Sequence, residues 1–71
     1  MNKENKFAQR LKELRQELGL SQRELADKIG CAKSSIGDWE TRNKETNYDM
    51  LFKLARFFKV SIDYLLGFVD L

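Results

Sequence analysis

The chain has 71 residues, of which 34% are charged, and its net charge is +2. A chain of this length is expected to form one domain over residues 1–71, with little room for an enclosed catalytic pocket. Histidine is absent and cysteine occurs once, so the commonest general base, a Cys–His nucleophile and an intrachain disulfide are excluded. We therefore expect no enzyme, no metal, and no cofactor or small-molecule ligand.

Nothing in the sequence predicts a membrane segment or a secretory leader. No apolar run approaches the roughly 18 residues of a membrane span. Residues 1–6 are polar and lack the apolar core of a signal peptide. A lone cysteine fits a reducing compartment, so the sequence predicts a cytoplasmic protein.

The first predicted helix covers about residues 4–18. Four apolar residues recur at helical spacing and should form its buried face: Phe7, Leu11, Leu14 and Leu18. The remaining faces carry mostly solvated charge, and Arg10 is placed there. Gly19 should end the helix, with Leu20 folding back onto its last turn.

The second predicted helix, over residues 22–29, begins with a capping box. In this arrangement the Ser21 hydroxyl accepts from the backbone of Glu24, and the Glu24 carboxylate accepts from the backbone of Ser21. Its buried face is formed by three residues: Leu25, Ala26 and Ile29. Gly30 can adopt the left-handed conformation that ends a helix and turns the chain.

The third predicted helix, over residues 33–41, has one apolar face and one polar face. Ile36 and Trp39, three residues apart, should be buried. The outward stripe consists of small and polar residues: Lys33, Ser34, Gly37 and Asp38. A helix anchored on one side and polar on the other fits the DNA major groove. The alternative is a generic helical hairpin in a small bundle, which would not require the small residue, the glycine and the polar stripe together.

Two residues weaken the third helix. Ala32 occupies the N-cap without a capping oxygen, which costs about 1 kcal/mol. Gly37 costs up to about 1 kcal/mol in the helix interior relative to alanine. Gly37 either permits a close approach to DNA or is simply tolerated, and the sequence leaves both open.

Residues 41–46 form a polar loop, followed by two further predicted helices. The helix over residues 48–58 is capped by Asn47, and its expected core face contains Met50, Leu51, Leu54, Ala55 and Phe58. The helix over residues 62–66 is capped by Ser61 and closed by Gly67. Residues 68–71 are apolar enough to pack on the domain, to form a subunit contact or to begin a linker to a further domain.

Matching blocks across the chain resemble the Cro-repressor-like, or XRE-type, helix-turn-helix DNA-binding family. These blocks are Phe7-x3-Leu11-x2-Leu14-Arg15, Gly19-Leu20-Ser21-Gln22-x2-Leu25-Ala26, Ile36-x2-Trp39-Glu40, Leu54-Ala55 and Val60-Ser61-x-Asp63-x-Leu65-Leu66. The resemblance implies an all-α, five-helix, lambda-repressor-like domain whose second and third helices form the helix-turn-helix. It also implies a partly buried ion pair between Arg15 and Glu40, for which the alternative is two unrelated surface charges.

The resemblance further implies which residues meet double-stranded DNA. The base-reading positions are Lys33, Ser34 and Asp38, with Ala32 able to touch a thymine methyl. Lys33 suits guanine and Asp38 suits the cytosine amino group, although Asp38 has the alternative of pairing with Lys33, Arg42 or another cation.

The expected contacts to the DNA backbone come from two places. One is the start of the second helix, with Ser21 and Gln22. The other is the loop, with Arg42 and Lys44, for which ordinary loop solubility is the alternative.

The resemblance favours a sequence-specific transcriptional regulator of phage or bacterial repressor type. It would bind a palindromic operator as a homodimer, with Tyr64, Phe68 and Val69 at or near the subunit contact. The alternative is a protein-interaction module of the same fold, such as an antitoxin or an anti-repressor target. Residues 29–46 carry three basic and three acidic groups, so modest non-specific DNA binding is expected.

Overall fold

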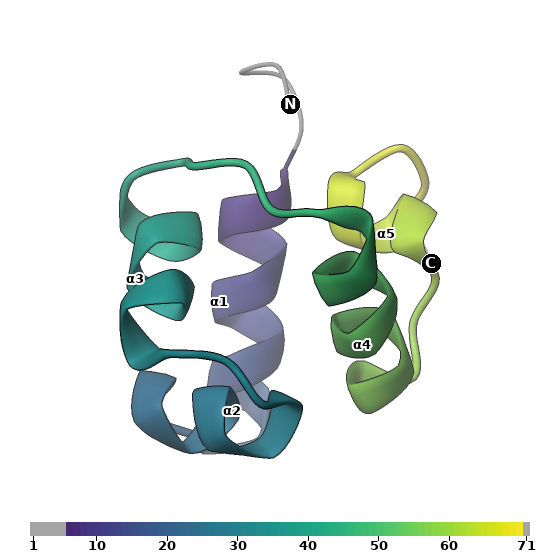
Figure 1. Ribbon diagram of the computed structural model, residues 1–71. Helices are drawn as coiled ribbons and strands as arrows, with labels where there is room; N and C mark the ends of the chain where they lie inside the picture. The colour runs from purple at the N-terminus through teal and green to yellow at the C-terminus, as the bar shows by residue number, and fades with distance from the viewer. Residues whose placement is uncertain (1–5, 71) are drawn as a thin grey trace.

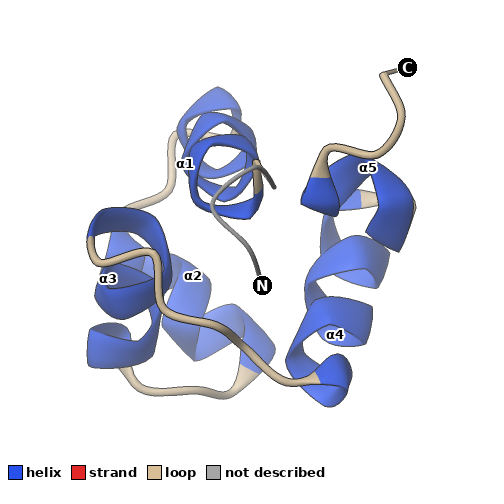
Figure 2. Cartoon of the chain, turned by 90° about the horizontal axis from the view of Figure 1, so that it is seen from above, coloured by secondary structure: helices blue, strands red, loops and turns tan. Residues whose placement is uncertain are grey.

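The computed structural model describes residues 6–70, which form five α-helices and no strands: α1 (Phe7–Glu17), α2 (Gln22–Ile29), α3 (Lys33–Thr41), α4 (Tyr48–Phe58) and α5 (Ile62–Leu66). The packing contacts run in a closed ring from α1 to α3, α2, α4, α5 and back to α1. Figures 1 and 2 show α3 on the left and α4 and α5 on the right, with α1 and α2 between them. This ring lets all five short helices share one core.

The core contains apolar side chains from every helix. Its buried members are Phe7, Leu11, Leu25, Ala26, Ile29, Ile36, Trp39, Leu51, Leu54, Ala55 and Leu65. Met50 and Phe58, which the sequence also places on the core face of α4, are partly buried and pack against this cluster. Among the described residues, no helix has the length and apolar character needed to cross a membrane.

Helix α1 is shorter than the sequence predicts. The expected start at residue 4 lies outside the described residues, and within them the helix begins at Phe7. Lys6 has non-helical backbone angles, and its N–H donates to the carbonyl of Leu66 at 3.0 Å. The chain passes so close here that a Cβ on Gly67 would lie 2.8 Å from the Lys6 Cβ. The start of α1 is therefore tied to the end of α5.

The expected burial of Leu18 is wrong, since 56% of this residue is exposed. Helix α1 ends at Glu17 with Leu18 as its C-cap, and Gly19 then takes a φ of 69°. The N–H of Leu20 donates to the Arg15 carbonyl at 3.1 Å, which closes the turn. Leu20, unlike Leu18, is partly buried and packs against the core.

The expected solvation of Arg10 is also wrong, because only 7% of this residue is exposed. Its Nη1 donates to the carbonyls of Tyr64 and Val69, each at 3.0 Å, and its Nη2 lies 2.6 Å from Asp70 Oδ1. The guanidinium also lies 4.1 Å from the centre of the Tyr64 ring. Arg10 thus holds the segment after α5 against α1, which is one of the three arrangements left open for that segment.

Candidate nucleic-acid interface

The start of α2 has the predicted capping box. The Ser21 Oγ accepts from the Glu24 N–H at 3.0 Å, and the Glu24 Oε1 accepts from the Ser21 N–H at 2.8 Å. The hydrogen bond that the Ser21 backbone donates to the Glu24 carboxylate, together with one from the Ser21 side chain, lowers the pKa of Glu24. The N–H groups of Gln22 and Arg23, the first two helical positions, have no partner within the helix, so they remain available to an anion.

The turn between α2 and α3 is formed by Gly30, which has a φ of 78°. The N–H groups of Gly30 and Cys31 both donate to the carbonyl of Ala26, at 2.8 and 3.0 Å. Burial raises the pKa of the Cys31 thiol. Ala26 is 1% exposed, and α2 and α3 pack against each other. This turn fixes the direction of α3 relative to α2.

Helix α3 is anchored through the predicted residues. Ile36 is fully buried and Trp39 is 7% exposed, with the Trp39 ring centre 6.1 Å from that of Phe7 in α1. Lys33 and Ser34 are exposed on the other face, as is Ala32 at the N-cap. Ala32 makes no side-chain capping bond. The start of α3 therefore presents its side chains to solvent while its middle is held in the core.

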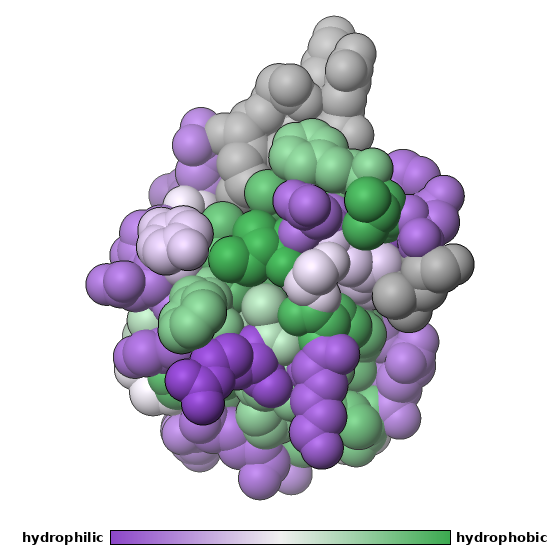
Figure 3. Space-filling model, turned by 90° about the vertical axis from the view of Figure 1, so that its right-hand side faces the viewer, coloured by the Kyte–Doolittle hydropathy of each residue, from purple (hydrophilic) through white to green (hydrophobic). Residues whose placement is uncertain are grey.

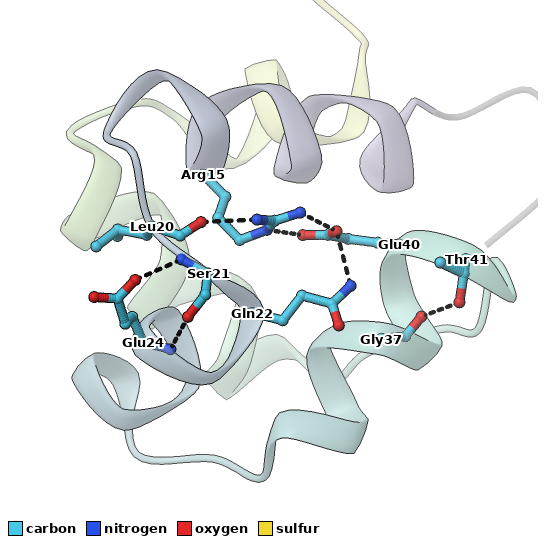
Figure 4. Close-up of polar contacts among 8 residues, drawn as sticks. All are labelled: Arg15, Leu20, Ser21, Gln22, Glu24, Gly37, Glu40 and Thr41. Carbon is cyan, nitrogen blue, oxygen red and sulfur yellow. Dashed lines mark hydrogen bonds and ion pairs between the residues drawn. The ribbon is translucent and has the colours of Figure 1, made fainter.

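A polar network fixes α3 against α1 and α2, as Figure 4 shows. Arg15 binds Glu40 through two contacts, from Nε to Oε2 at 2.7 Å and from Nη2 to Oε1 at 2.9 Å. Arg15 Nη1 also donates to the carbonyl of Leu20 at 2.7 Å. The two charged side chains are 11% and 1% exposed, and the hydrogen bond that Arg15 donates to Glu40 raises the pKa of Arg15. The structure confirms the expected ion pair.

Gln22 joins this network, which sequence reasoning did not anticipate. Its Nε2 donates to Glu40 Oε1 at 3.2 Å (Figure 4). A side-chain amide has two N–H groups, so the second remains available to a phosphate. The sequence indicated only that a polar residue occupies the first position of α2. It did not indicate the hydrogen-bond partner, because Glu40 lies 18 residues later.

The end of α3 brings together two of the predicted DNA-contacting residues. Arg42 Nε lies 3.8 Å from Asp38 Oδ1, with side-chain exposures of 70% and 35%. Pairing with a cation such as Arg42 was the alternative role expected for Asp38. As an exposed pair, this contact contributes less than about 1 kcal/mol to the stability of the fold. Lys44 is exposed in the loop, and its backbone N–H donates to the Asp38 carbonyl at 3.2 Å.

The comparisons with known proteins assign this arrangement of helices. The helix-turn-helix family HTH_3 matches residues 11–65, which cover α2 to α4 and most of α1 and α5. The chain is 47% identical over 64 residues to the uncharacterized HTH-type transcriptional regulator YobD of Bacillus subtilis. This chain belongs to the XRE-type helix-turn-helix family. The named relatives are HTH-type transcriptional regulators.

Solved structures of the family have the same fold. The N-terminal DNA-binding domain of SinR from Bacillus subtilis superposes with a TM-score of 0.80 at 35% identity, covering 87% of this chain and 91% of that domain. The P22 c2 repressor, solved in complex with a synthetic operator, also gives a TM-score of 0.80, at 30% identity over 86% of this chain and 92% of that one. The lambda-repressor-like fold is thereby confirmed.

The relatives are longer than this chain. The match to YobD covers 90% of this chain but 57% of that protein, and the match to the HTH-type transcriptional regulator ImmR of Bacillus subtilis covers 48% of its length. The chain thus spans about half the length of the curated relatives that it matches.

Proposed function

We propose that this domain binds double-stranded DNA in a sequence-specific manner, with α3 in the major groove. The observation that carries the proposal is the exposure of Lys33 and Ser34 on a helix whose opposite face is fixed by Ile36 and Trp39. A helix held in this way can insert its polar side without losing its packing. The P22 c2 repressor, which has the same fold, was solved on an operator.

The proposed base contacts come from the N-terminal half of α3 and from Asp38. Lys33 donates to guanine O6 and N7, and Ala32 touches a thymine methyl. The Ser34 hydroxyl can pair with either a donor or an acceptor on a base edge. Asp38 accepts from a cytosine amino group and repels phosphate, so Asp38 serves specificity more than affinity. Asp38 must break its contact with Arg42 for this role. Breaking this contact costs little free energy, because both side chains are partly solvated.

The proposed backbone contacts flank the reading helix. The Ser21 hydroxyl accepts from the Glu24 N–H, and it would donate its own hydrogen to a phosphate in place of the Glu24 carboxylate. Gln22 retains one amide hydrogen, and the exposed cations Arg42 and Lys44 extend the contact along the strand. These groups position the protein without reading sequence.

We further propose a homodimer that represses transcription from a palindromic operator. One helix reads only a few base pairs, and a two-fold pair would read half-sites about 34 Å apart. Phe68 and Val69 are 69% and 44% exposed next to α5, which suits a subunit contact. Tyr64 is less available, because its ring faces the Arg10 guanidinium.

Selection of DNA from a random-sequence pool at two salt concentrations tests this function. The expected result is an enriched inverted repeat and an affinity that falls as salt rises. If no motif is enriched, the protein-interaction role is favoured instead. Sedimentation of the chain with and without residues 68–71 tests the dimer separately, and an unchanged mass would count against the proposed contact.

A further inference from the structure

An open groove lies between the end of α2 and one face of α4. It has a volume of about 470 Å³, and we call it the α2–α4 groove. Its lining consists of three apolar and three cationic side chains: Ile29, Phe52, Phe57, Lys28, Lys53 and Arg56. The four residues from α4 fall at positions i, i+1, i+4 and i+5, which places them on one face of that helix.

The charge of the α2–α4 groove is not balanced by its own lining. No carboxylate lines it. Within residues 6–70, its three cations make no ion pair. Lys28 interacts at longer range with Glu24, one turn earlier in α2, and Arg56 lies 5.7 Å from the centre of the Phe52 ring. The groove therefore combines apolar surface with an excess of exposed positive charge.

The apolar surface continues beyond the groove. Phe57 also lines a second hollow of about 260 Å³, whose other apolar lining residues are Leu14, Leu18 and Phe58 and whose charged ones are Glu17 and Lys59. Leu18 is 56% exposed and Phe52 is 48% exposed. Figure 3 faces the side that carries α4 and α5, where green apolar side chains lie between purple polar ones. Because the two hollows share Phe57, they adjoin each other and together offer a surface for an extended partner.

We propose that the α2–α4 groove binds an acidic amphipathic helical segment of another protein. Apolar side chains of such a helix would pack on Ile29, Phe52 and Phe57, and its flanking carboxylates would face the three cations. DNA fits less well, because the sugar–phosphate backbone offers little apolar surface to these side chains. Helices α3 and α4 also lie on opposite sides of the fold in Figures 1 and 2, so a peptide here would leave α3 free.

This interaction does not depend on the proposed DNA-binding function, and its test uses a displayed library of peptides about 15 residues long. In this library, positions i, i+3, i+4 and i+7 carry Leu, Ile, Phe or Met, and the other positions vary among Glu, Asp, Lys and Ser. The expected result is enrichment of Glu and Asp, with selected peptides that bind less tightly as salt rises. Enrichment of lysine-rich peptides, or of none, would overturn the proposal.

Variants of the full chain locate the binding surface. Reversing two exposed charges, in a Lys53→Glu, Arg56→Glu double variant, should weaken the selected peptide at least about tenfold, and Phe52→Ser should do the same. The control Lys12→Glu reverses an exposed lysine of α1 that does not line the groove, and should change the affinity less than about twofold. If the double variant instead weakens DNA binding as much as Arg42→Ala, the surface belongs to the DNA interface and the peptide site is refuted.

Discussion

Arg15 in α1 and Glu40 in α3 are joined by two nitrogen–oxygen contacts, of 2.7 and 2.9 Å, although they lie 25 residues apart. The Glu40 carboxylate is 1% exposed and also accepts from Gln22 in α2. The carboxylate of Glu40 therefore ties α3 to both α1 and α2. The geometry of the proposed DNA interface depends on this pair as well as on apolar packing.

Replacing Glu40 by alanine should destabilise the domain strongly. The substitution leaves the largely buried Arg15 guanidinium without its counter-charge, which typically costs about 3–5 kcal/mol. Urea unfolding measures the loss, and Glu17→Ala, which removes an exposed carboxylate of α1, should stay within about 0.5 kcal/mol of the parent. Equal stabilities for the two variants would mean that the pair adds nothing to the fold.

Arg10 and Asp70 should contribute very differently, although they form one ion pair. The Arg10 side chain is 9% exposed, while that of Asp70 is 85% exposed. Arg10→Ala removes two hydrogen bonds to backbone carbonyls and the packing on Tyr64, so we expect a loss of about 2–3 kcal/mol. Asp70→Asn should cost less than about 1 kcal/mol, because water screens the exposed carboxylate. Denaturant midpoints of both variants check this order, and the reverse order would contradict it.

Gly37→Ala should stabilise the domain by up to about 1 kcal/mol, through a lower helix cost. Within residues 6–70 and apart from its own helix backbone and chain neighbours, a Cβ at this position would meet the Gln22 Oε1 alone, at an ordinary distance of 3.7 Å. Thermal unfolding measures the gain, and a loss of stability would show that Gln22 cannot yield. DNA affinity of the same variant decides the question that the sequence leaves open. A drop would mean that glycine permits close approach, and no change would mean that it is only tolerated.

Lys33→Ala and Arg42→Ala should have different signatures in DNA binding. Loss of Lys33 should alter the preference at one or two base pairs by about 1–3 kcal/mol. Loss of Arg42 should weaken all sequences alike and reduce the salt slope by about one. Lys12→Ala serves as the control outside the interface. A Lys33→Ala variant with the parental preference profile would show that the reading face is assigned wrongly.

The capping box should add a component of stability that depends on pH. Folding lowers the pKa of Glu24 from 4.5, chiefly because the backbone of Ser21 donates to the carboxylate. Its contribution is therefore complete above about pH 4.5 and disappears as the pH falls through the lower folded pKa. Glu24→Gln does not titrate, so its stability deficit relative to the parent at neutral pH should shrink in acid. Unfolding curves at several pH values test this, and a deficit independent of pH would contradict it.

The sequence by itself determined the features that act over a few residues. Ser21 and Glu24 cap α2, Asn47 and Ser61 cap the last two helices, and Gly30 ends α2 in the left-handed conformation. Each of these caps and turns depends on groups within about four positions of one another, where spacing alone determines which groups form hydrogen bonds. The apolar spacing of Ile36 and Trp39 likewise indicated which face of α3 is buried and which is free.

Only the tertiary structure decided the environments set by distant parts of the chain. Arg10 stands three residues after Phe7 and four before Leu14, so its place on the apolar face could have been read. Its burial, however, depends on carbonyls 54 and 59 residues later. The bond from Gln22 to Glu40 and the groove around Phe57 likewise require the relative placement of separate helices. Helical periodicity specifies the direction of a side chain from its own axis, but what that side chain meets is determined by how the helices pack.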